Sequence, residues 1–291
     1  VVEAPRSDAA SAAGEAAVRA AAAAESRLST WQTESELARL NRSPVGDRIA
    51  LSPELARDLG EAAGWWRETG GAFHPGLAAL VQAWDLRGAG REPSEVELAA
   101  ARAAIRMELL ELDADSARRL DRGFGFEEGG FGKGVALRCA ADAALAAGAT
   151  CVALDLGGQL HLAGSCAVRS VAIADPDSRN RTVATVPLQS GSAASSGNSE
   201  RAVVVGGRRH GHLLDPRTGR PAPDFGSVTV VAADPVAADC LATALFVLGP
   251  EAGLAWAEAH DGVEALFVLR GAGGPRLLMT RGLARLVEPV G

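Results

Sequence analysis

The sequence lacks several features that would place it in a broad class. No stretch reaches the roughly 18 consecutive apolar residues that a membrane-spanning helix needs, so we expect no membrane span. Basic residues are not in excess, because the net charge is −7 and the pI is near 5.4. This balance argues against nucleic acid or an anionic membrane surface as a partner. No signal peptide is recognisable, so we expect a cytoplasmic location, or an extracytoplasmic one if a signal or lipobox precedes Val1.

Three residue types are also scarce. Tyrosine is absent, and Lys133 is the only lysine. The four cysteines, Cys139, Cys151, Cys166 and Cys240, are scattered without a CxxC spacing. Since they lie in apolar surroundings, we expect buried thiols rather than zinc ligands or a disulfide framework.

What is present indicates a globular protein of mixed class. The 291 residues are 47% apolar and 22% charged, enough for a substantial core. Helical and strand patterns are interleaved, and short turns join many neighbouring strands. This pattern favours an α+β fold with largely antiparallel short strands over a doubly wound parallel sheet. No linker divides the chain, so we expect one domain over residues 1–291.

Capping signals predict where several helices begin. Ser52 precedes Pro53, Ser94 has Glu97 at the capping-box position, and Asp234 precedes a proline. We expect helices to follow each of them, and a mobile loop at residues 88–90.

The segment His210–Pro221 reads HGHLLDPRTGRP and holds two of the five histidines. Its proline and glycine predict a rigid turn after a short strand. A histidine mounted there can serve as a general base, or it can be a solvated residue on a surface hairpin. The segment by itself leaves both open.

Two further segments have the chemistry of a phosphate site. Glu127–Gly134 is glycine-rich, ends beside the only lysine and precedes a helix, so it can contact phosphate or be a plain loop. Asp239 and Thr243 are one helical turn apart and share a face. They can supply two oxygen ligands to Mg²⁺, or be an exposed first-turn acid and a core threonine.

Other segments are compatible with ligand contact. Trp31 can stack on a flat ring or belong to the core. Gly157 and Gly158 follow a buried strand and allow close backbone approach. Residues 195–201, SSGNSER, form a polar stretch that we interpret as a ligand-lining turn.

These segments together resemble the flavin transferases of the ApbE type, which move FMN from FAD onto a serine or threonine of a target protein. The resemblance rests on STWQTESELARLN, GAFHP, EEGGFGKGVA, LGGQ, SSGNSER, HLLDPRTG and ADCLATAL, found in that order at residues 29–41, 71–75, 127–136, 156–159, 195–201, 212–219 and 238–245.

The resemblance implies a role for individual residues. His212 would deprotonate the acceptor hydroxyl. Asp239 and Thr243, with the Gly130 carbonyl, would hold Mg²⁺ on the pyrophosphate of FAD. The residues that would contact FAD are Trp31, Ala72, Phe73, His74, Glu127, Lys133, Gly157 and Gly158.

The sequence also departs from the family pattern. His74 and Glu127 each stand where the family has aspartate, and Gln159 stands where it has asparagine. The family's opening A-M-G-T strand is missing from residues 1–291, and we interpret Val1–Pro5 as the end of a strand. Two alternatives are a metal-dependent FAD pyrophosphatase that gives FMN and AMP, and a flavin-binding protein without catalysis.

Overall fold

The computed structural model describes residues 1–198, 202–205 and 208–289. The chain divides into two compact units, and each is treated by itself. The sheet unit comprises residues 1–24, 131–199 and 223–291, and the helical unit comprises residues 25–130 and 200–222. The one-domain organisation expected from the sequence stays a prediction.

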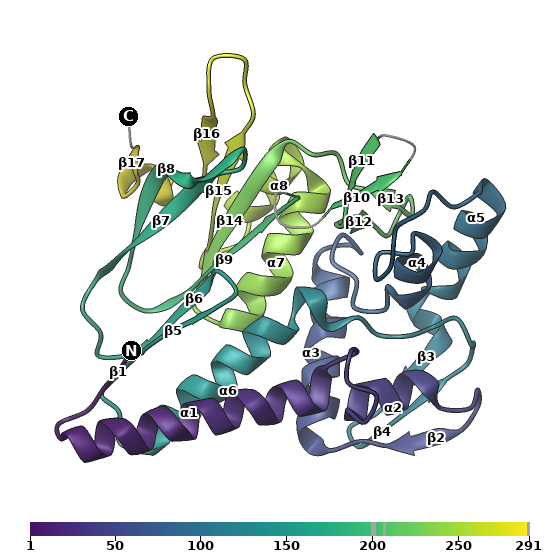
Figure 1. Ribbon diagram of the computed structural model, residues 1–291, viewed down its shortest axis with the longest axis horizontal. Coiled ribbons are helices and arrows are strands. Elements are labelled where there is room, and N and C mark those ends of the chain that lie inside the picture. Colours follow the sequence, from purple (N-terminus) through teal and green to yellow (C-terminus); the bar gives the residue numbers. More distant parts are fainter. Residues whose placement is uncertain (199–201, 206–207, 290–291) are drawn as a thin grey trace. The chain divides into compact units, whose positions relative to one another are not determined.

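The sheet unit is built on a seven-stranded antiparallel sheet (Figure 1). Its strands, in spatial order, are β1 (Val2–Glu3), β5 (Cys151–Leu156), β6 (Gln159–Gly164), β9 (Gly191–Gly197), β14 (Gly226–Ala232), β15 (Val263–Leu269) and β16 (Arg276–Met279). A three-stranded sheet packs beside it, made of β17 (Glu288–Pro289), β8 (Ser178–Leu188) and β7 (Arg169–Asp175). The antiparallel α+β fold is therefore confirmed.

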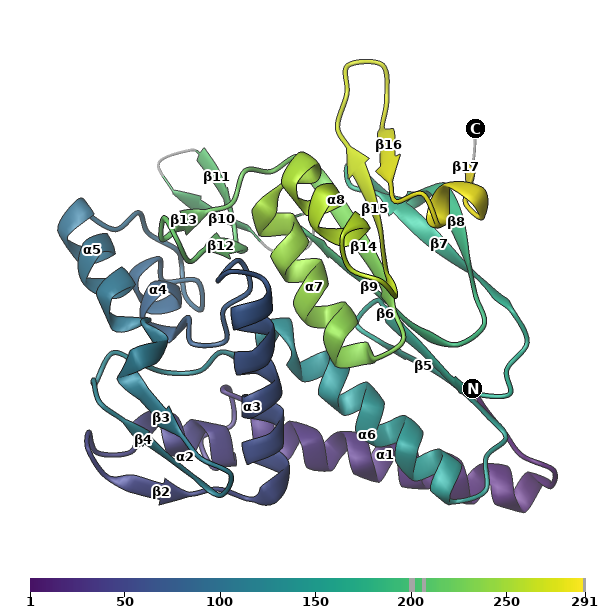
Figure 2. The same ribbon diagram turned by 180° about the vertical axis from the view of Figure 1, so that it is seen from behind.

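Helices α6 (Gly132–Ala146), α7 (Pro235–Leu248) and α8 (Pro250–Glu258) pack against strands of the large sheet (Figure 2). A 3₁₀ turn, Leu283–Arg285, precedes β17. Val230 and Phe267 on the sheet and nearly all of α7 are buried, so the core lies between α7 and the sheet.

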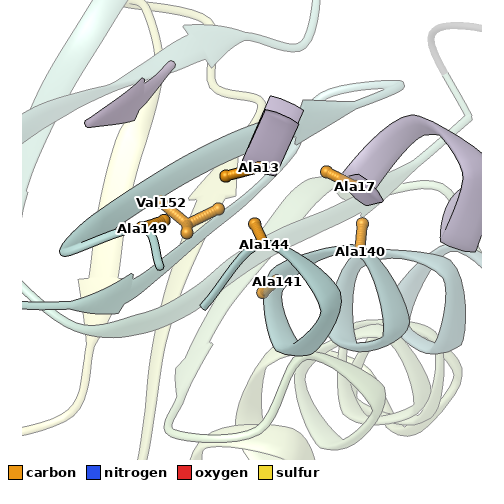
Figure 3. Packing of buried hydrophobic residues seen from close by; sticks show 7 residues of the cluster. All are labelled: Ala13, Ala17, Ala140, Ala141, Ala144, Ala149 and Val152. Carbon is orange, nitrogen blue, oxygen red and sulfur yellow. The ribbon is translucent and has the colours of Figure 1, made fainter. Parts of the chain in front are cut away.

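Helix α1 (Ser7–Leu28) is seated on α6 by small side chains (Figure 3). Ala13 and Ala17 of α1 meet Ala140 and Ala144 of α6, and the same cluster includes Ala141, Ala149 and Val152. Because alanine ends at Cβ, the two helices can approach closely.

The described part of the helical unit contains four helices and three small sheets. The helices are α2 (Glu36–Arg42), α3 (Pro53–Glu68), α4 (Ala78–Ala83) and α5 (Glu95–Ala104). One sheet has β2 (Arg48–Ala50), β4 (Ser116–Arg119) and β3 (Leu110–Leu112), and the other two are the hairpins β10 (Ala202–Val205) with β11 (Arg208–Gly211) and β12 (Leu214–Asp215) with β13 (Arg220–Pro221). Short 3₁₀ turns occupy Met107–Leu109 and Glu128–Gly130.

The helix starts predicted from the sequence are confirmed. Ser52 caps α3 with Pro53 in the first turn, and Ser94 and Glu97 form a reciprocal capping box on α5. Asp234 caps α7 by accepting two backbone N–H bonds. Among the described residues, no helix combines the length and the apolar character needed to cross a bilayer.

The expectation for the cysteines was wrong for one pair. Cys151 and Cys166 form a disulfide, whereas Cys139 and Cys240 remain thiols. The cause is the register of the β5–β6 hairpin, in which Cys151 lies opposite Gly164. Cys166 follows two residues later and folds back onto the start of β5.

Candidate active site

In the helical unit, the loop that carries Trp31 is shaped by two serines. The Ser29 hydroxyl accepts the backbone N–H groups of Trp31 and Gln32, both at 3.3 Å. Ser35 donates its hydroxyl to the Ser29 carbonyl and caps α2 by accepting the Ala38 N–H at 2.9 Å. These bonds leave the indole of Trp31 63% exposed, so it is not a core residue.

The asparagine at the end of the same motif places Glu127. The Asn41 amide donates to the Phe126 carbonyl at 2.9 Å and accepts the Phe126 N–H at 2.8 Å. The next residue, Glu127, donates its N–H to the Pro75 carbonyl at 2.8 Å. Three segments that the sequence identified as motifs are thereby joined at one place.

An arginine that no sequence motif identified connects Trp31 with Glu127. Arg87 Nη2 donates to Glu127 Oε2 at 2.6 Å, and Nη1 donates to the Thr30 carbonyl at 3.0 Å. Its guanidinium carbon lies 4.6 Å from the centroid of the Trp31 ring. Burial raises the pKa of Glu127 above its ordinary value, and the charge and hydrogen bond of Arg87 act in the opposite direction.

The GAFHP segment is more deeply buried than Trp31. The side chains of Ala72 and Phe73 are in the core, and His74 is 8% exposed. The Gly76 N–H donates to His74 Nδ1 at 3.0 Å, which leaves the proton on Nε2. Burial lowers the pKa of His74 to about 4, although a hydrogen bond to the Ile105 backbone partly opposes it. The aspartate of the family pattern is thus replaced by a neutral ring at neutral pH.

The structure separates the two histidines of the HGH segment. His210 lies in β11, and its ring centre is 5.4 Å from that of Trp84. His212 is half-buried and lies on the connection between β11 and β12. His210 has a packing role, and His212 is the histidine next to the turn.

The DPRTG residues themselves build that turn. Asp215 accepts the Arg217 N–H at 2.9 Å and holds its guanidinium through two further bonds. Gly219 has φ of 74°, and its carbonyl accepts the Trp84 indole N–H at 2.8 Å. Leu214 is buried in the α4–α5 core. The motif therefore anchors the segment that follows His212.

In the sheet unit, Lys133 and Asp239 form an ion pair. Lys133 Nζ lies 2.8 Å from Asp239 Oδ1, and the Gly134 N–H donates to Oδ2 at 3.1 Å. Lys133 and Gly134 are in the first turn of α6, and Asp239 is near the start of α7 and only 3% exposed. Two helix N-termini, each favourable to negative charge, thus meet at one carboxylate.

Close packing makes this meeting possible. A Cβ at Gly134 would lie 2.4 Å from the Pro235 carbonyl oxygen, so only glycine fits. The buried amide of Gln159 donates to the same carbonyl at 2.7 Å. Gly157 and Gly158, with φ of 58° and 83°, form the β5–β6 turn. Any side chain at Gly157 would contact Lys133.

The oxygen donors of α7 fit a hard cation. Thr243 follows Asp239 by one turn and is half-buried. Each Asp239 oxygen keeps a lone pair beyond the bond it already accepts. No group of three His, Cys, Asp or Glu residues lies close enough to hold a metal within residues 1–198, 202–205 and 208–289. A cation there would need phosphate or backbone oxygens as well, as Mg²⁺ commonly has.

One interpretation needs correction. Ser195, Ser196 and Gly197 belong to β9, where the Ser195 and Thr229 hydroxyls lie 2.7 Å apart, so this part is strand and not turn. Asn198 is buried after the strand. Ser199, Glu200 and Arg201 lie outside the described residues.

Comparison with known proteins places these motifs in one family, because the profile of the ApbE family matches residues 2–267. The chain belongs to the ApbE family. It is 30% identical over 262 residues to the FAD:protein FMN transferase of Treponema pallidum, an alignment that covers 83% of this chain and 72% of that protein.

Solved ApbE structures share the fold. The ApbE protein of Thermotoga maritima superposes with a TM-score of 0.86 at 26% identity, covering 94% of this chain and 90% of that one. The apo flavinyl transferase ApbE of Pseudomonas stutzeri gives 0.82 at 26% identity, covering 98% and 90%.

Within the ApbE fold, the residues proposed from the sequence divide between the two units. Trp31, Glu127 and the connecting Arg87 lie together in the helical unit, as do His74 and His212 with the segments described above. Lys133, Gly157 and Asp239 lie together in the sheet unit. Their roles toward FAD and Mg²⁺ stay predictions.

Proposed function

We propose that this chain transfers FMN from FAD to a serine or threonine hydroxyl of an acceptor protein in an Mg²⁺-dependent reaction that releases AMP. One observation carries the proposal. The ApbE family profile matches residues 2–267, and His212, Asp239 and Thr243 all stand at the motif positions of that family.

His212 takes the proton from the acceptor hydroxyl. The hydroxyl oxygen then forms a bond to the FMN-side phosphorus of FAD, and the bond from that phosphorus to the bridging oxygen breaks, so AMP leaves. The rigid Asp215–Gly219 turn supports this role, because a general base must be held in a defined position.

Asp239, Thr243 and the Gly130 carbonyl would hold Mg²⁺. When bound, the ion neutralises charge that develops on the pyrophosphate oxygens as the bond breaks. The N-termini of α6 and α7 favour the same negative charge, and Lys133 adds a full positive charge at that place. Lys133 contacts the pyrophosphate in this proposal and also pairs with the buried Asp239 carboxylate.

The remaining contacts are with the rings and ribityl chain of FAD. In this proposal Trp31 offers an exposed indole face and Glu127 accepts hydrogen bonds, while Gly157 and Gly158 allow the cofactor to approach the backbone closely. For the buried residues Ala72, Phe73 and His74, contact with FAD stays an implication of the family pattern. The Treponema pallidum relative is named for the same substrate and product pair.

The test uses purified protein, FAD, MgCl₂ and an acceptor domain that carries a serine or threonine flavinylation motif. In-gel flavin fluorescence measures labelled acceptor, and chromatography measures AMP. We expect labelling that requires Mg²⁺ and that is lost in His212→Ala. AMP and FMN without labelled acceptor would instead establish a pyrophosphatase, and FAD binding without either product would establish a non-catalytic flavin-binding protein.

The location of the protein is a separate proposal. A disulfide forms and persists in oxidising compartments and is rare in the cytosol. The Cys151–Cys166 bond therefore favours the extracytoplasmic alternative over the cytoplasmic location expected from the sequence. A mass increase of two hydrogen atoms on reduction of protein taken from its native host, without prior air oxidation, would test it.

A further inference from the structure

Arg87 lies in a turn closed by hydrogen bonds, where the sequence predicts a mobile loop at residues 88–90. The Arg91 N–H donates to the Trp84 carbonyl at 3.0 Å and closes the turn. Asp85 has φ of 49°, the one positive φ of a residue other than glycine among those described. Its carboxylate accepts the Gly90 N–H at 3.3 Å. A residue held in the left-handed region costs free energy, so the surrounding bonds must determine this turn.

The buried end of the turn is equally fixed. Trp84 is fully buried, and its indole N–H is bonded to the Gly219 carbonyl. The backbone of the turn that carries Arg87 is therefore anchored to the core. The guanidinium itself is held by the hydrogen bonds of its own side chain.

The guanidinium contacts three residues at once. It donates to the carbonyl and hydroxyl of Thr30 and to the Glu127 carboxylate, and it stacks on the indole of Trp31. Only a planar cation with several donors can make these hydrogen bonds and also lie over the indole, because the ammonium of lysine has neither a flat face nor a fork of donors. Thr30 also donates its hydroxyl to Glu128, which extends the network to the residue after Glu127.

We propose that Arg87 is a positioning residue of the flavin nucleotide site, which holds Trp31, Thr30 and Glu127 in the arrangement that receives an aromatic ring of FAD. The inference rests on the proposed function, since it takes FAD as the ligand. It goes beyond that function because none of the motif segments contains residue 87.

The physical reason is preorganisation. An indole with 63% exposure has freedom to rotate, and freezing it on binding would reduce affinity. Contact with the guanidinium on one face fixes the ring before the ligand arrives, and the other face is available for stacking. The same guanidinium orients Glu127 toward one hydrogen-bonding geometry.

Equilibrium titration of FAD, followed by quenching of flavin fluorescence, tests the proposal without requiring turnover. We expect Arg87→Gln to raise the Kd for FAD about tenfold, as loss of a stacking and a charge-assisted contact implies. Arg87→Lys should restore little of the affinity. The matched control is Arg91→Gln, which removes an arginine of the same turn that pairs instead with Glu97.

A double-mutant cycle with Trp31→Leu separates positioning from independent binding. If Arg87 acts through the indole, Arg87→Gln in the Trp31→Leu background should weaken binding by clearly less than tenfold. In transfer assays the KM for FAD should rise more than kcat falls. Urea unfolding midpoints of each variant establish that the fold is retained.

Three results would overturn the proposal. The first is a Kd for Arg87→Gln equal to that of the wild type. The second is a lower Kd, which would mean that the guanidinium competes with FAD for the indole. The third is a double variant whose increase in Kd equals the product of the increases in the two single variants. A wild-type protein that does not bind FAD would overturn the proposed function itself, whereas normal wild-type binding with an unaffected Arg87→Gln variant would overturn only this inference.

Discussion

Replacing Gly134 by alanine should destabilise the protein, whereas the same replacement at Gly14 should stabilise it. Both glycines are inside helices, α6 and α1. An added Cβ at Gly134 would lie 2.4 Å from the Pro235 carbonyl oxygen and 2.6 Å from the Val236 Cα, and both are backbone atoms of α7 that cannot move alone. At Gly14 nothing lies within 4 Å of an added Cβ.

The expected magnitude follows from three contributions. Overpacking of this kind costs about 1–3 kcal/mol. Separating α6 from α7 also loses the bond from the Gly134 N–H to the Asp239 carboxylate, and a hydrogen bond to a charged group contributes about 1.5–3 kcal/mol. Alanine gains about 0.5–1 kcal/mol over glycine in a helix. The net loss at Gly134 is then about 1.5–5.5 kcal/mol, and the gain at Gly14 is about 0.5–1 kcal/mol.

Urea unfolding followed by circular dichroism measures both variants. We expect the midpoint of Gly134→Ala to fall and that of Gly14→Ala to rise slightly. Substitutions at unconstrained surface sites usually change the free energy of unfolding by less than about 0.5 kcal/mol. If the free energy of unfolding of Gly134→Ala differs from that of the wild type by no more than this, the two helix N-termini do not meet as described. That result would also contradict the placement of Lys133 beside Asp239.

Three further predictions concern single groups. Asp239→Asn keeps the size of the side chain but loses the charge, so we expect FMN transfer to fall by about 100-fold or more and its saturation with Mg²⁺ to disappear in a metal titration. The folded-state pKa of His74 is about 4, below its ordinary 6.5, so the unfolded chain binds the proton more tightly. The free energy of unfolding should therefore drop as the pH falls from 6.5 to 4, by about 3 kcal/mol, and His74→Asn should remove that slope in urea titrations. Reduction of the Cys151–Cys166 disulfide, which closes a span of 15 residues, should lower the free energy of unfolding by about 3 kcal/mol, measured with and without dithiothreitol.

Local chemistry made much of the fold predictable from the sequence. Ser52, Ser94 and Asp234 cap helices because a side-chain oxygen meets backbone N–H groups within three residues, and such short-range bonds are visible in sequence. The glycine pair at 157–158, which the sequence places at the end of a buried strand, forms the turn between β5 and β6 with positive φ.

Features set by distant contacts were harder to foresee. Arg87 is one arginine among many, and its significance arises only when the folded chain brings Thr30 and Glu127 to it. The disulfide was foreseeable in part, since a hairpin centred on residues 157–158 puts Cys151 opposite residue 164. Neither the CxxC spacing nor the apolar surroundings of a cysteine carries that register.

The alanine contact between α1 and α6 lies on the same helix that carries Lys133 in its first turn. Alanine has no side-chain rotamers, so this contact forms without loss of rotamer entropy and has essentially one geometry. Ala144 and Lys133 are on the same rigid helix, about 16 Å apart along its axis at 1.5 Å per residue. A side chain larger than alanine at Ala144 would overpack the contact with α1, on the same helix whose first turn carries Lys133.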